Sequence, residues 1–213
     1  MTTYALQGPR RGFDRAVLLA HGAGTDLDAA PLRVVAEALA DAGIPSLRFN
    51  YPYRDAGRKA PDRPPVLVDA TRAAVAELAR RTKLPPERLV IGGRSMGGRY
   101  CSLVAAAEDD PVPVRGLLLL GYPLHTAGKP EKVRDDHFRR LTMPVLFVSG
   151  TRDALASRAD LRRSARKVTG VVSWCWLEAA DHGFRPLKSS GNTLDGVLTT
   201  VAEASVAWVR ALP

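Results

Sequence analysis

The chain has 213 residues, 46% of them hydrophobic and 25% charged, which is ordinary for a globular protein and excludes disorder as its overall state. Its formal net charge of +9 would suit a polyanion, but the basic residues are dispersed along the sequence. The densest basic group, within 158–167, is interleaved with Leu161 and Ala165, as on the solvated face of a helix. We therefore expect no nucleic-acid partner.

We expect neither a signal peptide nor a membrane-spanning segment. The first stretch, MTTYALQGPRRGFDRAVLLAHGAG, lacks a charged segment followed by a continuous apolar one, and no run of 18 apolar residues occurs. Two cysteines, Cys101 and Cys175, do not make a disulfide framework in a chain of this length. We expect one domain over residues 1–213, cytoplasmic, without a membrane partner, and monomeric or homodimeric.

Apolar runs and amphipathic stretches alternate along the chain, separated by segments rich in Gly, Pro and polar residues. In chain order, the expected elements are a strand at 16–20, a helix between Pro31 and Gly43, a strand at 44–51, a loop at 52–65, a helix at about 66–81, a strand at 88–93, a helix at about 95–108, a strand at 114–122, a polar segment at 123–142, a strand at 144–150, a helix near 157–168, a strand at 170–178 and a helix near 194–211.

This order predicts an α/β fold. Strands that are continuous apolar runs are typical of a parallel sheet with both faces covered. We therefore predict a three-layer α/β/α sandwich around a mostly parallel, doubly wound sheet. Functional residues of such sheets gather at the carboxyl ends of the strands, so we expect them just after residues 20, 93, 150 and 178.

The stretch VIGGRSMGGR at 90–99 places two glycines on each side of Arg94-Ser95-Met96, directly after a predicted strand. Glycine weakens a regular element by about 0.5–1 kcal/mol, so four glycines here indicate a steric demand. Residues 93–97 satisfy G-x-S-x-G between a strand and a helix, the context in which a serine nucleophile stands on a sharp turn. The alternative is a serine that merely caps a helix.

A serine hydroxyl is a weak nucleophile and needs a base within hydrogen-bond reach. Where this motif occurs, the catalytic residues follow the chain order serine, acid, histidine. His182, in AADHGF after the last strand, comes late enough to be the base. His125 and His137 precede every suitable acid and are weaker candidates.

The acid should follow a strand between Ser95 and His182. Asp153, in PVLFVSGTRDAL, comes three residues after the final glycine of such a strand and could fix the tautomer of the imidazole. Asp181 is adjacent to His182 in sequence and is poorly placed to align its ring. Asp160 falls in or near a helix, so Asp153 is the predicted acid.

An acyl-transfer site also needs N–H donors for the developing oxyanion. The residue after the nucleophile supplies one, so the Met96 amide is the first candidate. The stretch HGAG follows the strand at 16–20 and offers Ala23 as the second donor, with Gly24 behind it. We expect His21 to brace this turn rather than touch substrate.

Further residues near the predicted elbow have two interpretations. Arg94 and Arg99 could clamp a substrate carboxylate or phosphate, but a structural pair that anchors the elbow is favoured. Gly24, Arg94 and Tyr122 are the candidate substrate contacts. Cys101 is expected in the core.

The motifs HGAG, GGRSMGGR, GTRDAL and DHGF match the α/β-hydrolase superfamily in order and position, and the chain resembles that superfamily over nearly its whole length. GGRSMGGR with DRPP and PLHTAGKPEK is similar to a small subgroup close to dienelactone hydrolases, which includes bacterial predicted hydrolases and eukaryotic testis-expressed and chromatin-complex proteins. The resemblance implies nucleophile Ser95, acid Asp153 and base His182. It implies no substrate, and some members serve as interaction proteins.

The sequence departs from the family pattern in three ways. Only 15 residues precede the first central strand, so the usual N-terminal hairpin should be shortened or lost. The segment 123–142 is too short for a helical cap domain, so we expect an open, shallow site partly covered by 52–65 and 123–142. The nucleophile of dienelactone hydrolases is typically cysteine, and serine here favours ester chemistry.

Together these features favour a serine hydrolase that cleaves a small ester or thioester through an acyl-enzyme. No metal or organic cofactor is expected, because the cysteines and histidines lack ligand spacing. The first alternative is a non-catalytic interaction or scaffold protein that keeps the elbow. The second is a nucleic-acid binder, motivated by the net charge alone.

Overall fold

The computed structural model describes residues 2–213. Its strands are β1 (Tyr4–Gln7), β2 (Ala16–Ala20), β3 (Ser46–Phe49), β4 (Leu89–Arg94), β5 (Gly116–Leu120), β6 (Val145–Gly150) and β7 (Val172–Leu177). Its helices are α1 (Ala30–Asp41), α2 (Pro52–Asp55), α3 (Pro64–Thr82), α4 (Met96–Ala105), α5 (Arg158–Ala165) and α6 (Leu194–Ala211). Short 3₁₀ helices cover η1 (Pro86–Arg88), η2 (Asp136–Arg140) and η3 (Lys188–Ser190).

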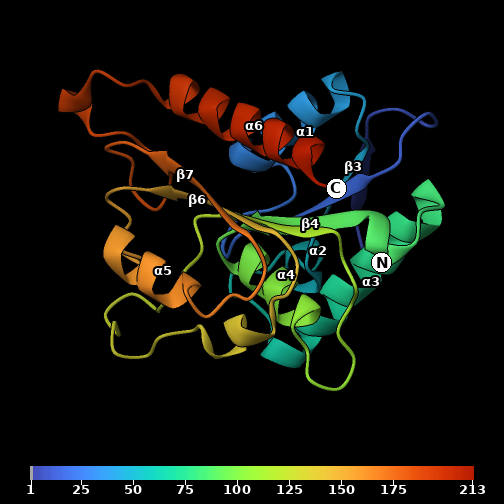
Figure 1. Cartoon of the computed structure of the whole chain (residues 1–213), viewed down its shortest axis with the longest axis horizontal. Coiled ribbons are helices and arrows are strands. Elements are labelled where there is room, and N and C mark those ends of the chain that lie inside the picture. The colour runs from blue at the N-terminus through green and yellow to red at the C-terminus, as the bar shows by residue number, and fades with distance from the viewer. Residues whose placement is uncertain (1) are drawn as a thin grey trace.

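The strands form one seven-stranded sheet in the order β1-β3-β2-β4-β5-β6-β7. This sheet runs across the middle of Figure 1, between two layers of helices. All neighbouring strands are parallel except β1, which pairs antiparallel with β3. The strand order reverses beside β2 and β4, so the carboxyl ends of these central strands open onto a crevice. The predicted α/β fold with a mostly parallel, doubly wound sheet is confirmed.

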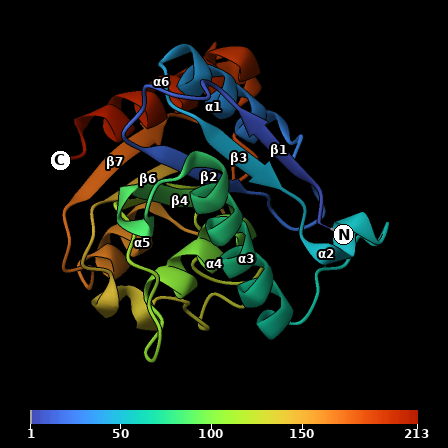
Figure 2. The same ribbon diagram turned by 90° about the vertical axis from the view of Figure 1, so that its right-hand side faces the viewer.

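Helices cover both faces of the sheet (Figure 2). α1 and α6 pack side by side on one face, and α3, α4 and α5 cover the other. Successive residues of a strand point to opposite faces, so Val17 joins the core under α1 and α6 while Leu18 joins the core under α3 and α4. No helix in the described part of the chain is long and apolar enough to cross a bilayer.

Two short elements differ from the sequence expectations. β1 was not predicted, because its four residues are half-buried and too few to show a clear alternation. Residues 2–15 thus contain one short strand, which pairs antiparallel with β3. α2 lies inside the expected loop 52–65, where Pro52 starts a single helical turn with its fixed φ.

The segment 123–142 contains no helix beyond the five-residue η2. It packs beside α4, where His137 Nε2 lies 2.8 Å from Ser102 Oγ, and the Arg134 amide donates to Leu124 O at 2.7 Å. A helical cap is therefore absent from this segment, as its length predicted.

Candidate active site

Three of the predicted site residues follow the carboxyl ends of different strands. Ser95 comes directly after β4, Asp153 comes three residues after β6, and His182 lies in the turn after β7. Because the strands are parallel, these ends meet at one edge of the sheet. Side chains up to 87 residues apart in sequence are thereby brought within hydrogen-bond distance.

Ser95 stands on a strained turn between β4 and α4. Its φ of 49° and ψ of −113° are sparsely populated for a residue with a side chain. The turn fits because β2 passes close beneath it: a Cβ atom on Gly93 or Gly97 would collide with the carbonyl oxygen of Ala20. The glycines of this stretch thus meet a steric demand, and the Ser95 amide is fixed by Leu120 O at 2.9 Å.

The side chains of Ser95, His182 and Asp153 form an unbroken hydrogen-bonded chain. Ser95 Oγ lies 2.9 Å from His182 Nε2, and His182 Nδ1 lies 2.8 Å from Asp153 Oδ2. The Asp153 side chain is fully buried, and its Oδ1 accepts the Leu155 amide at 2.8 Å. An ionised carboxylate can only accept, so Nδ1 carries the imidazole proton. Nε2 is then free to accept the serine proton.

The rival acids are engaged elsewhere. Asp181 Oδ1 accepts the Arg185 amide at 2.9 Å, and Asp160 hydrogen-bonds Ser157 at the start of α5. Neither Asp181 nor Asp160 makes a hydrogen bond or an ion pair with His182 within residues 2–213. Of the other histidines, His125 Nδ1 lies 3.0 Å from the carbonyl oxygen of Thr126.

His21 braces the turn that follows β2. It is fully buried, its Nε2 accepts the Tyr51 amide at 3.1 Å, and its Nδ1 donates to Gly22 O at 2.8 Å. Burial lowers the pKa of His21 below its ordinary value, so the ring is neutral, as this donor–acceptor pattern requires. Gly22 O also accepts the Thr25 hydroxyl at 3.0 Å and the Thr25 amide at 3.3 Å.

This bracing fixes the peptide group that carries the Ala23 amide. In a trans peptide the N–H points opposite to the C=O, and Gly22 O is held by His21 and Thr25. The Ala23 amide therefore points away from those donors, and Ala23 lines the same cleft as Ser95. The Met96 amide is the first of α4, where N–H groups have no partner within the helix. Gly24 does not line this cleft.

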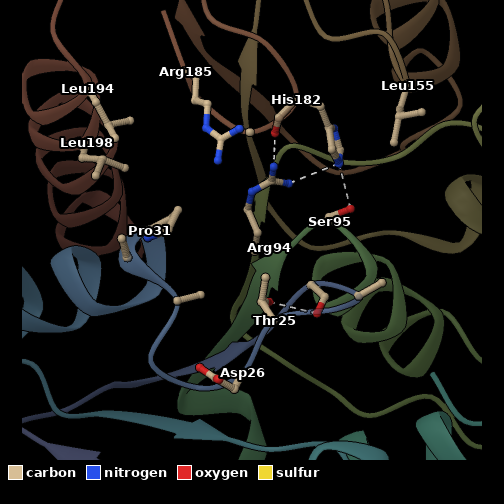
Figure 3. Close-up of a pocket in the computed structure, with 15 residues that line it drawn as sticks. Thr25, Asp26, Pro31, Arg94, Ser95, Leu155, His182, Arg185, Leu194 and Leu198 are labelled. Carbon is tan, nitrogen blue, oxygen red and sulfur yellow. Dashed lines mark hydrogen bonds between the residues drawn. The ribbon is translucent and has the colours of Figure 1, made fainter. Parts of the chain in front are cut away.

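Arg94 lines the cleft, but its guanidinium is occupied. Its Nη2 donates to His182 O (Figure 3). Its Nη1 reaches Leu120 O at 3.4 Å, and the group stacks 4.7 Å above the Phe184 ring. Its Nη1 also lies 3.4 Å from His182 Nε2. Burial lowers its pKa to about 10, so it stays charged near neutrality. These contacts support the structural interpretation.

One further expectation, a substrate contact at Tyr122, fails on position. Tyr122 does not contact the cleft: it is 1% exposed, and its hydroxyl donates to Arg134 O at 2.7 Å. Its ring packs in the core, with its centroid 5.1 Å from that of Phe138. Burial raises its pKa. Arg99 lies 5.5 Å over the Tyr100 ring and also stays outside the cleft.

The cleft beside Ser95 has a volume of about 750 Å³. Its walls come from the start of α1, the start of α6 and Leu155 (Figure 3). Neither 52–65 nor 123–142 lines it, contrary to expectation: α2, in the first segment, packs on α3, and the second segment packs beside α4. Pro31, Leu155, Arg185, Leu194 and Leu198 line it without having been predicted. Of these five residues, only Arg185 could have been predicted from the sequence, because it lies close to His182 along the chain.

The family described as the alpha/beta hydrolase domain matches residues 13–210, nearly the whole chain. The chain belongs to the alpha/beta hydrolase family. The resemblance predicted from its motifs is thus confirmed.

Solved structures show the same hydrolase fold at low sequence identity. An alpha-beta serine hydrolase homologue from Coxiella burnetii is 16% identical, with a TM-score of 0.72 over 97% of this chain and 90% of that one. A dienelactone hydrolase from Anabaena variabilis is 21% identical, with a TM-score of 0.68 over 99% and 92%. A serine hydrolase without lid from Xanthomonas campestris is 18% identical, with a TM-score of 0.68 over 100% and 91%.

Proposed function

We propose that this alpha/beta hydrolase is a serine hydrolase that cleaves a small ester or thioester through an acyl-enzyme on Ser95. The hydrogen-bonded chain from Ser95 Oγ through His182 to the buried Asp153 carries the proposal. It supplies an activated nucleophile, a base in the required tautomer and an acid that stabilises the imidazolium.

In the first half of the reaction, Ser95 Oγ attacks the substrate carbonyl carbon while His182 Nε2 takes the hydroxyl proton. The Met96 and Ala23 amides stabilise the resulting oxyanion, and one such donor contributes about 2.7–4 kcal/mol in comparable sites. The tetrahedral intermediate collapses, the C–O or C–S bond to the leaving group breaks, and His182 protonates the departing alcohol or thiol.

In the second half, the alcohol or thiol has left the cleft and a water molecule takes its place beside the acyl-enzyme. His182 takes a proton from this water, whose oxygen attacks the acyl carbon. The ester bond to Ser95 then breaks, His182 returns the proton to Ser95 Oγ, and the carboxylic acid leaves. A cleft that is open at this edge and has no helical cap suits a small or extended substrate.

The test is active-site titration with p-nitrophenyl butyrate. We expect a burst of p-nitrophenol, about one equivalent per chain, in the parent, and no burst after Ser95→Ala or His182→Ala. Ser102→Ala is the matched control: Ser102 Oγ also lies 2.8 Å from a histidine, His137, but both side chains are buried away from the cleft. This control should keep the burst.

Labelling with a fluorophosphonate separates the enzyme from a scaffold protein. The probe reacts with an activated serine whatever the natural acyl group, so the parent should be labelled at Ser95. A folded parent that neither gives a burst nor takes up the probe would contradict the proposal and favour the interaction-protein alternative.

A further inference from the structure

One cation in the cleft takes no part in the chain of Ser95, His182 and Asp153. Arg185 lines the cleft, and Figure 3 shows its guanidinium pointing into the space between Leu194 and Arg94. Within residues 2–213, its side chain makes no hydrogen bond and no ion pair; only its backbone is engaged. A guanidinium offers five donors in a planar fork.

The backbone of Arg185 is rigidly tied to that of His182. The Arg185 amide donates to Asp181 Oδ1 at 2.9 Å, and the Asp181 amide donates to Arg185 O at 3.0 Å, closing the turn that contains His182. Phe184 between them is fully buried. The start of the Arg185 side chain thus keeps a constant position relative to the base.

The other charged residues of the cleft are already paired. Arg94 donates to backbone carbonyls, and Asp26 at the far side lies 3.4 Å from the guanidinium of Arg54. Arg185 is therefore the free cation among the described lining residues. The walls beside its exposed side chain are apolar, with Leu194 and Leu198 on one flank.

The start of α1 adds to the attraction that Arg185 exerts on an anion. Ala29, Ala30 and Pro31 line the cleft at the beginning of α1, which has no capping side chain and no acidic residue in its first turn. An uncapped helix N-terminus carries partial positive charge. It reinforces the field of Arg185 without defining a site by itself.

We propose that Arg185 recognises a free carboxylate on the substrate, so that the enzyme prefers a monoester or monothioester of an aliphatic dicarboxylic acid. The inference rests on the proposed function, because it assigns the substrate class to that same site. The scissile carbonyl lies at Ser95, the methylene chain packs on Leu194 and Leu198, and the carboxylate meets the guanidinium fork.

A carboxylate fits this cleft better than a phosphate monoester. A phosphate monoester carries about −1.5 to −2 charges near neutrality, whereas one guanidinium is free. The remaining negative charge would face Asp26 across the cleft. A single carboxylate is neutralised by Arg185 alone.

The decisive experiment measures binding without turnover. In the Ser95→Ala variant, monomethyl adipate and methyl hexanoate differ only by a carboxylate in place of a terminal methyl group. We expect the adipate monoester to bind at least about tenfold tighter, since a charge-assisted hydrogen bond contributes about 1.5–3 kcal/mol. Arg185→Gln should abolish this preference. Arg139→Gln, which removes an exposed arginine outside the cleft, should leave it intact.

Equal affinities, undetectable binding of the adipate monoester, or a preference that survives Arg185→Gln would each overturn the inference. Tighter binding of the phosphonate analogue of equal length would also overturn it, in favour of a phosphate site. Arg185→Lys should retain part of the preference, because the charge remains while the planar fork is lost.

Turnover by the parent separates this inference from the proposed function. We expect Arg185→Gln to lower kcat/KM about tenfold for mono-p-nitrophenyl adipate and less than about twofold for p-nitrophenyl hexanoate. Turnover of both esters without this selective loss would overturn the inference and leave the hydrolase intact. Selective binding without burst or probe labelling would contradict the hydrolase and leave the carboxylate site intact.

Discussion

His21 illustrates how a residue can serve an acyl-transfer site without touching substrate. Its two ring nitrogens join the Tyr51 amide to Gly22 O, and both of these bonds are buried. The orientation of the Ala23 amide depends on this carbonyl. Sequence order alone places His21 beside the turn; the two hydrogen bonds explain why a histidine, with one donor and one acceptor, suits it.

We expect His21→Leu to reduce kcat more than it changes KM. The substitution leaves the Tyr51 amide buried without an acceptor, which costs about 1–3 kcal/mol of stability. It also loosens the Gly22–Ala23 peptide, and we expect about a tenfold loss of kcat from a misplaced oxyanion donor. Steady-state kinetics and urea unfolding of the same samples measure both effects.

Thr25→Val is the companion variant, since it removes a different donor to Gly22 O and leaves the Tyr51 bond intact. It should give a smaller loss of kcat with little change in stability. An unchanged kcat in His21→Leu would show that the Ala23 amide plays no part in the reaction.

At the scale of elements, the approach of α4 to β2 decides whether the elbow can form. Gly97 lies in the first turn of α4, and a Cβ atom there would collide with the Ala20 and His21 carbonyl oxygens. Glycine in a helix is otherwise unfavourable by about 0.8–1 kcal/mol relative to alanine. Close packing between helix and strand therefore outweighs helix propensity at this position.

Gly97→Ala should accordingly destabilise the protein, by about 3 kcal/mol, despite the better helix propensity of alanine. The obstacle is backbone, so α4 itself must move. Gly43→Ala is the matched control: its φ of +79° is strained for alanine, but the space around it is open. That change should cost only about 1 kcal/mol. Urea unfolding compares the two, and a Gly97→Ala protein as stable as the parent would refute the packing argument.

At the scale of the whole molecule, a buried histidine links stability to pH. His137 is 4% exposed, and burial, with Arg99 and Arg140 nearby, lowers its pKa to about 4. The unfolded chain binds this proton near pH 6.5. Between the two values the unfolded state holds more protons, so the free energy of unfolding falls as pH decreases from about 6.5 toward 4. Burial of His21 acts in the same direction.

We expect the parent to lose about 2 kcal/mol of stability through His137 between about pH 7 and pH 5. His137→Gln keeps a hydrogen-bonding group near Ser102, and its free energy of unfolding should change by about 2 kcal/mol less between these two pH values. His125→Gln replaces a loop histidine whose contact with Thr126 O is exposed, and its free energy of unfolding should depend on pH as in the parent. Urea unfolding at the two pH values gives the comparison. Equal slopes for all three proteins would mean that His137 is not protected from protonation.

The sequence by itself determined the fold class, most element positions and the order of the predicted nucleophile, acid and base. These depend on local signals, since strand and helix periodicity, the G-x-S-x-G turn and the residues after each strand are readable over short windows. It missed β1 and α2, because four-residue elements leave too few positions for a pattern.

Only the tertiary structure decided the shape and charge of the cleft. Its walls join the start of α1 to the start of α6, more than 150 residues later, and no local pattern encodes that meeting. The same packing buries Tyr122, occupies Arg94 and leaves the Arg185 side chain without a partner among residues 2–213. Whether a polar side chain is free depends on its neighbours in space, and sequence spacing does not fix those neighbours.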